Sequence, residues 1–120
     1  MRIVITAQEP SLDSPIDPRF GRARHFILAD TQSGAFTAHD NAQNLNAPQG
    51  AGIQAAQGVA RLGAEAVLTG HVGPKAFAVL EAANILVYTG AGGTVREAID
   101  GFKSGKLQAI QTADVEGHWS

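Results

Sequence analysis

The 120-residue chain contains no cysteine, which excludes disulfide bonds and excludes protein thiolates as metal ligands. A strong charge of one sign is also missing, since nine Lys and Arg stand against eleven Asp and Glu, for a formal net charge of −2. General nucleic-acid affinity needs a broad basic face, so we expect no nucleic-acid partner. No apolar run approaches the length of a membrane span, and the first predicted strand begins at Arg2. We therefore expect no signal peptide, no membrane partner and a cytoplasmic location.

What the chain does have is enough apolar sequence for one core. Hydrophobic residues make up 44% of it, and 120 residues can bury a single core without covalent staples. The length predicts one domain spanning residues 1–120, which we expect to act as a monomer.

Short β-branched runs alternate with stretches of helical spacing along the chain. Strands are predicted at 2–7, 24–30, 35–40, 65–70 and 85–90, helices at 53–62, 73–83 and 94–104, and a further edge strand at 106–110. The order βββαβαβα indicates an α/β fold with a mixed five-stranded sheet. Its second strand is antiparallel to the others, and helices cover both faces. Two segments are predicted to be mobile: the amide-rich loop 41–52, when no ligand is bound, and the tail 113–120.

In this topology four loops emerge on one rim of the sheet, at 8–23, 41–52, 70–73 and 90–93. The last three each lead into a helix N-terminus, which offers free N–H groups and partial positive charge to an anion. Glycines in these loops let the backbone approach a ligand closely: Gly50, Gly52, Gly70, Gly73, Gly90, Gly92 and Gly93. The rim is therefore predicted to bind anions, although glycines in such turns also have purely steric uses.

The segment "IDPRFGRARHF" (16–26) concentrates three of the nine basic residues, Arg19, Arg22 and Arg24, next to this rim. Two interpretations are open. The arginines complete an anion site, or they are solvated or paired locally with Asp13 and Asp17.

Histidines are the remaining candidates for chemistry at the rim. His39 and His71 should reach it and His25 should lie beside it, so His71 and His39 are candidates for contact with a ligand or a metal. No two of them have the helical ligand spacing of a zinc site. The chain also lacks a nucleophile elbow and paired strand carboxylates, which favours a binding module over an enzyme.

Three stretches carry a family resemblance: "DPRFGRARHF", "GAGIQAAQGVARLGAEAVLTGHVGPKAFAVLEAANILVY" and "GTVREAIDGFKSGKL". They resemble the dinitrogenase iron–molybdenum cofactor biosynthesis family, which includes NifX and the C-terminal domain of NifB. One family motif falls on Arg19, Phe20, Gly21, Arg22, Ala23 and Phe26, and a second on Thr69, Gly70, Gly73, Pro74, Ala76 and Phe77. The resemblance implies a ribonuclease-H-like three-layer fold and a role in carrying anionic metal–sulfur clusters.

Within the family, a stand-alone domain without cysteine looks most like members from sulfate-reducing bacteria. Those members hold a mixed molybdenum–copper sulfide cluster noncovalently. Such a cluster brings its own sulfide shell, so it needs positive potential, N–H donors and apolar walls, for which Arg19, Arg22, the glycine loops, Phe20, Ile53 and Val72 are available. The resemblance also implies protein partners in a cluster-handling or cell-division-associated complex. The alternative is a small enzyme or sensor that binds a phosphorylated metabolite or nucleotide at the same rim.

Overall fold

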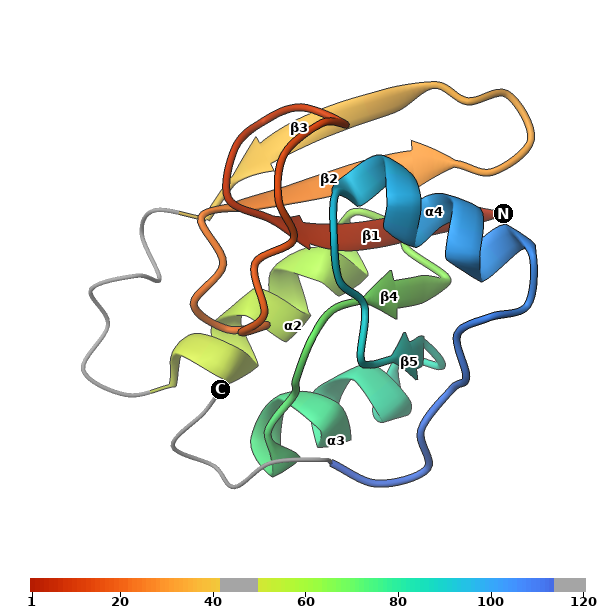
Figure 1. Cartoon of the computed structure of the whole chain (residues 1–120). Coiled ribbons are helices and arrows are strands. Elements are labelled where there is room, and N and C mark those ends of the chain that lie inside the picture. Colours follow the sequence, from red (N-terminus) through yellow and green to blue (C-terminus); the bar gives the residue numbers. More distant parts are fainter. Residues whose placement is uncertain (42–49, 114–120) are drawn as a thin grey trace.

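Figure 1 shows the computed structural model of the chain, which describes residues 1–41 and 50–113. The elements follow the predicted order: β1 (Arg2–Ala7), β2 (His25–Asp30), β3 (Phe36–Asp40), α2 (Ala51–Arg61), β4 (Ala66–Leu68), α3 (Pro74–Ala82), β5 (Leu86–Tyr88) and α4 (Val95–Lys103). None of these helices is long and apolar enough to cross a membrane.

The five strands form one mixed sheet in the order β3-β2-β1-β4-β5. β2 runs antiparallel to both β1 and β3, whereas β4 is parallel to β1 and to β5. The prediction of a single antiparallel strand is therefore confirmed. Because β1, β3, β4 and β5 point the same way, their carboxyl ends lie at one edge of the sheet, on the left in Figure 1.

Side-chain alternation along β1 divides the interior into two cores, one on each face of the sheet. Val4 faces α2 and α3, where it joins the cluster that includes Val59 and Leu80. Ile3 and Ile5 face α4 and pack in a second cluster with Val95. Figure 1 shows the resulting three layers, with α2 and α3 on one side of the sheet and α4 on the other. Helices thus cover both faces, as predicted.

The structure differs from the prediction at several boundaries. α2 begins at Ala51, two residues earlier than expected, directly after Gly50, whose φ of 80° lies in the left-handed region that favours glycine. The predicted edge strand 106–110 is wrong. Within the described residues, the backbone of this segment pairs with β5 through an isolated bridge between Tyr88 and Ala109 and a hydrogen bond from Ile110 N to Val87 O, which do not make a strand. The mobility predicted for 41–52 and 113–120 falls largely outside the described residues.

Candidate anion-binding cleft

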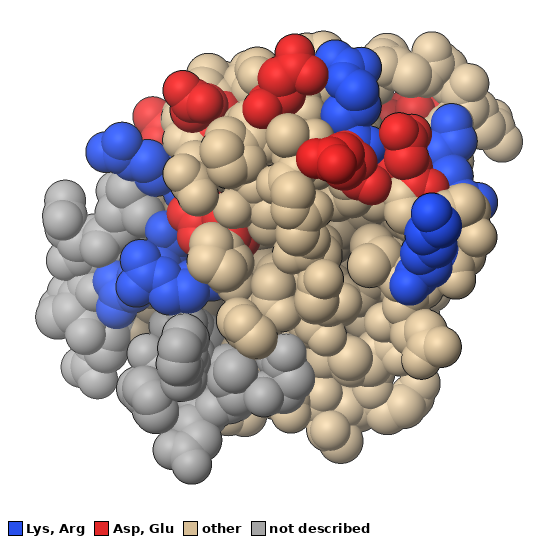
Figure 2. Space-filling model, viewed as in Figure 1, with Lys and Arg blue, Asp and Glu red and all other residues tan. Residues whose placement is uncertain are grey.

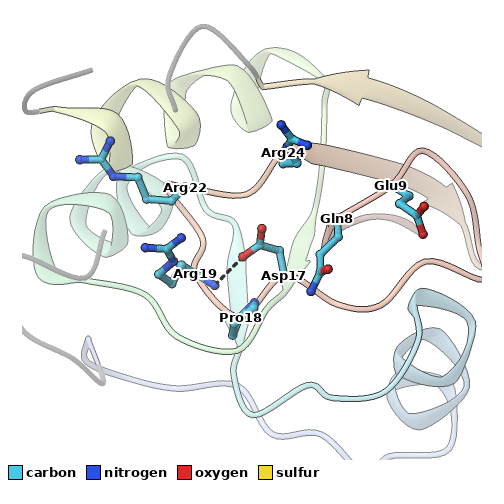
Figure 3. Close-up of a pocket in the computed structure, with 7 residues that line it drawn as sticks. All are labelled: Gln8, Glu9, Asp17, Pro18, Arg19, Arg22 and Arg24. Atoms are coloured by element: carbon cyan, nitrogen blue, oxygen red, sulfur yellow. Dashed lines mark hydrogen bonds between the residues drawn. The ribbon is translucent and has the colours of Figure 1, made fainter. Parts of the chain in front are cut away.

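An open cleft of ≈ 990 Å³ lies at the carboxyl edge of the sheet, where the chain leaves β1 and returns to β2. Its lining consists of Gln8, Glu9, Asp17, Pro18, Arg19, Arg22 and Arg24. All three arginines of the "IDPRFGRARHF" segment therefore line one cavity. We refer to it as the arginine cleft (Figure 3).

One wall of the cleft is formed by the short segment 17–20, which we call the arginine strap. It pairs with the turn that follows β4, because His71 N donates to Pro18 O at 2.8 Å and Phe20 N donates to His71 O at 3.2 Å. Arg19 and His71 are partners in an isolated parallel bridge. Paired residues of a parallel bridge project to the same side, so the structure places Arg19 of the first family motif beside His71, an unspecified position inside the second motif.

Gly70 lets the strap approach this closely. A Cβ atom at Gly70 would lie 2.7 Å from both the Cα and the O atom of Pro18, a distance that real Cβ atoms do not tolerate. The glycine is therefore required by the backbone contact itself, and its φ lies outside the left-handed region.

Charges in the arginine cleft are segregated. Figure 3 shows the three arginines in one half of the cleft and the Glu9 carboxylate directed away from them in the other half. Asp17 lies between, only 8% exposed, and its Oδ1 accepts a hydrogen bond from the backbone N of Arg19 at 3.1 Å. Figure 2 shows one group of Lys and Arg on the left flank of the molecule, at the carboxyl edge of the sheet, and other Lys and Arg on the right that are interspersed with Asp and Glu.

Within the described part of the chain, the structure does not show the local ion pairs that would neutralise Arg19 and Arg24. Asp13 pairs instead with Arg96 of α4, with its Oδ1 3.2 Å from Nε. Asp17 binds the backbone of Arg19 rather than its guanidinium. Across residues 1–41 and 50–113, no carboxylate forms an ion pair with Arg19 or Arg24, and both side chains are exposed. Arg22 is half-buried.

Two of the expected apolar wall residues are in the core. Phe20 and Val72 have no exposed surface, and the Phe20 ring stacks on Phe26 with centroids 5.8 Å apart. Gly21 is buried beside Phe20, and Ile53 is half-buried. Packing of Phe20 and Val72 in the core therefore holds the strap and the 70–73 turn in place, while the arginines extend toward the surface.

The three helix N-termini differ in how open they are. α2 and α3 begin after Gly50 and Gly73 without a side-chain cap. α4 begins at the predicted capping box, in which Thr94 accepts from Glu97 N and the Glu97 side chain accepts from Thr94 N. Its next N–H groups are also bonded, since Val95 N donates to Ser14 O and Arg96 N to Leu12 O. Of the three, only α2 and α3 present uncapped N-termini for an anion.

The glycines of the predicted rim differ in their burial. Gly52, Gly70 and Gly73 are buried, and Gly50, Gly90, Gly92 and Gly93 are exposed. Gly90 N already donates to Gly70 O, and a Cβ atom at Gly93 would lie 2.7 Å from Glu97 Oε1. Gly90 and Gly93 therefore serve the turn and the cap before α4.

The histidines occupy separate places. His71 is half-buried beside Arg19. His39 lies in another cavity, of ≈ 210 Å³ between β3 and α2, where its Nε2 is 2.8 Å from Thr37 Oγ1. His25 opens β2, opposite Asp40. Within the described ranges, no group of three or more His, Asp or Glu side chains could hold a metal ion.

The sequence prediction missed part of the lining. Gln8 and Glu9 directly follow β1, so their place at the carboxyl edge could have been read from the strand boundary. Pro18 contributes through its backbone contact with Gly70, for which the sequence offers no local signal.

Comparisons with known proteins agree with this architecture. Residues 1–105 match the family model described as dinitrogenase iron–molybdenum cofactor. The apo form of the orange protein from Desulfovibrio gigas is 43% identical, with a TM-score of 0.93 and coverage of 95% of this chain and 96% of that one. A NifB-like protein of Thermotoga is 37% identical, with a TM-score of 0.83 and coverage of 97% and 98%. A protein of Methanocaldococcus jannaschii is 28% identical over 104 residues, which are 85% of this chain and 88% of the relative.

The family match covers most of the chain, and Arg19 of its first sequence motif pairs with His71, which lies between the specified residues of the second motif. Family membership and the orange-protein relative together indicate a role in binding or handling a metal-cluster cofactor. This chain belongs to the dinitrogenase iron–molybdenum cofactor family.

Proposed function

We propose that this protein is a noncovalent binding protein for an anionic metal–sulfide cluster, of the mixed molybdenum–copper sulfide type, and that it carries, stores or helps to assemble it. The observation that carries the proposal is the arginine cleft. Three arginines line it, two of them exposed and without an ion pair to any described carboxylate. The protein is proposed to bind its cargo without catalysing a reaction.

The chemistry of the lining suits a cargo whose metals are already coordinated. The chain has no thiolate, and the described residues contain no cluster of metal-ligating side chains. A thiomolybdate-type cluster needs neither, because inorganic sulfide fills its coordination sphere. It needs donors that match negative charge, and guanidinium groups are the strongest such donors in proteins.

His71 and the N-terminus of α2 are proposed as secondary contacts. His71 projects beside Arg19, and the first N–H groups of α2 follow the exposed Gly50. Phe20 and Val72 are proposed to act through the backbone they hold in place.

The direct test is a titration of tetrathiomolybdate, alone and with copper, into wild type, Arg19→Ala and Arg22→Ala at two ionic strengths. Loss of one guanidinium should cost about 1.5–3 kcal/mol, roughly ten- to a hundredfold in affinity. Affinity should also fall as salt rises, because the cleft is open to solvent. Arg2→Ala is the matched control, since exposed Arg2 begins β1 at the opposite edge of the sheet.

Equal affinity in wild type and both cleft variants would remove the arginine cleft from the proposal. Parallel titrations with ATP and inorganic phosphate test the alternative ligand class. Tight binding of ATP, with none of thiomolybdate, would favour a nucleotide sensor at this site. Protein purified from its native source should absorb visible light and contain molybdenum and copper.

A further inference from the structure

Two threonine hydroxyls are buried beneath the arginine strap. Thr6 of β1 and Thr69, directly after β4, have no exposed surface. Their Oγ1 atoms are 2.9 Å apart, and Thr6 Oγ1 is 2.7 Å from the backbone O of Asp17. Thr69 belongs to the second family motif, yet it does not line the arginine cleft.

The available protons determine which threonine donates in each of these two hydrogen bonds. A hydroxyl has one proton to donate, and the carbonyl of Asp17 can only accept. Thr6 therefore donates to Asp17 O and accepts from Thr69. The chain of bonds runs from the end of β4, through β1, to the first residue of the arginine strap.

Thr6 also holds the other side of Asp17, because Asp17 N donates to Thr6 O at 3.0 Å. Asp17 is thereby fixed at both its N–H and its C=O, and its carboxylate accepts from Arg19 N at 3.1 Å. Asp17 thus links Thr6 to the backbone of Arg19 through hydrogen bonds on both sides, and Figure 3 shows the bond between Asp17 and Arg19.

We propose that Thr6 and Thr69 are positioning residues for cargo binding, which fix the arginine strap so that Arg19 points into the cleft. This inference rests on the proposed function. Removing the Thr6 hydroxyl leaves the Asp17 carbonyl buried without its side-chain donor, and the strap can relieve that penalty only by moving. The cost therefore appears in the geometry of Arg19 as well as in the free energy of unfolding.

The experiment compares Thr6→Val, which is nearly isosteric and lacks the hydroxyl, with Thr6→Ser, which keeps it, and with Thr69→Val. Thr31→Val is the control, because Thr31 Oγ1 also donates to a carbonyl, that of Met1 at 3.3 Å, but after β2 at the far edge of the sheet. Each variant is titrated with tetrathiomolybdate and copper, and the cargo-free amide resonances of Arg19 and His71 are recorded.

Thr6→Val should weaken binding about three- to tenfold and shift the Arg19 amide resonance, because one buried hydrogen bond is lost. Thr6→Ser should restore both, and Thr31→Val should change neither. If folded Thr6→Val binds as tightly as wild type while Arg19→Ala does not, the positioning role is refuted and the proposed function stands. If wild type itself does not bind the cargo, the proposed function fails and this inference with it. Should Thr6→Val not fold, Thr69→Val is compared with Thr6→Ser by the same two readouts. Thr69→Val should weaken binding and shift the Arg19 amide resonance, and wild-type values in both readouts would refute the positioning role.

Discussion

Gly70→Ala should separate the arginine strap from the turn that supports it. The added Cβ atom would stand 2.7 Å from the Cα and O atoms of Pro18, and both are backbone or ring-constrained atoms that cannot rotate away. Ordinary contact begins at 3.4 Å, so the strap or the turn must move by about 0.7 Å. The backbone conformation of Gly70 does not itself require glycine, so the effect is steric.

Overpacking of this kind typically costs about 1–3 kcal/mol. For a domain of this size, the melting temperature should fall by about 4–12 °C. The two hydrogen bonds between His71 and the strap should weaken, so affinity for tetrathiomolybdate and copper should fall towards that of Arg19→Ala. Thermal unfolding followed by circular dichroism and the cargo titration measure the two effects.

Gly101→Ala in α4 is the matched control, because an added Cβ atom there meets the Cγ of Leu107 at an ordinary 3.9 Å, its φ is not in the left-handed region and it does not line the arginine cleft. It should leave cargo affinity unchanged and should not lower the melting temperature, since Ala is favoured over Gly inside a helix. If Gly70→Ala melts and binds like wild type, the close packing of the strap on the 70–73 turn is not what sets the position of Arg19.

Three further outcomes are expected. Thr94→Ala removes the capping box of α4 and should lower the free energy of unfolding in urea by about 0.5–2 kcal/mol without changing cargo affinity. Hydrogen bonds from Gln32 N and Ser33 N lower the pKa of Asp30, so its carboxylate should titrate below its ordinary range by NMR; its contribution to stability is present above the unfolded-state pKa and is lost as pH falls through the folded-state value. Ring resonances of His71 should shift on cargo binding, whereas those of His39, in a separate cavity, should not.

The topology could be predicted from the sequence because it depends on local periodicity. The buried run of β1, the alternation of its side chains between two cores and the Thr94–Glu97 box are all legible from neighbouring residues. The edge strand at 106–110 could not be judged in the same way. Its apolar residues suit a strand, but whether it pairs depends on how the chain returns from α4 to a β5 of only three residues.

The sequence could place the arginines of the candidate cleft at the carboxyl edge of the sheet, but it could not predict the contacts that surround them. The rim, its arginines and the neighbouring His71 follow from strand direction alone. By contrast, Ser14 closes the N-terminus of α4 through its backbone oxygen, and Asp13 turns to Arg96 rather than to the arginine strap. These contacts join residues about 80 positions apart in the chain (83 for the Asp13–Arg96 pair), so no local pattern encodes them.

A nearly neutral chain can still present exposed positive charge if the neighbouring carboxylates do not pair with the arginines. Asp13 pairs with Arg96, and the carboxylate of Asp17 accepts from a backbone N–H that would otherwise lack a partner in the strap. The guanidinium groups of Arg19 and Arg24 are left exposed, without an ion pair to any carboxylate in the described chain. Because Asp17 holds the Arg19 backbone and not its side chain, it fixes where the positive charge emerges without neutralising it through a direct ion pair. Under the proposed function, the same carboxylate orders the strap before cargo binds, which reduces the conformational entropy that binding would otherwise cost.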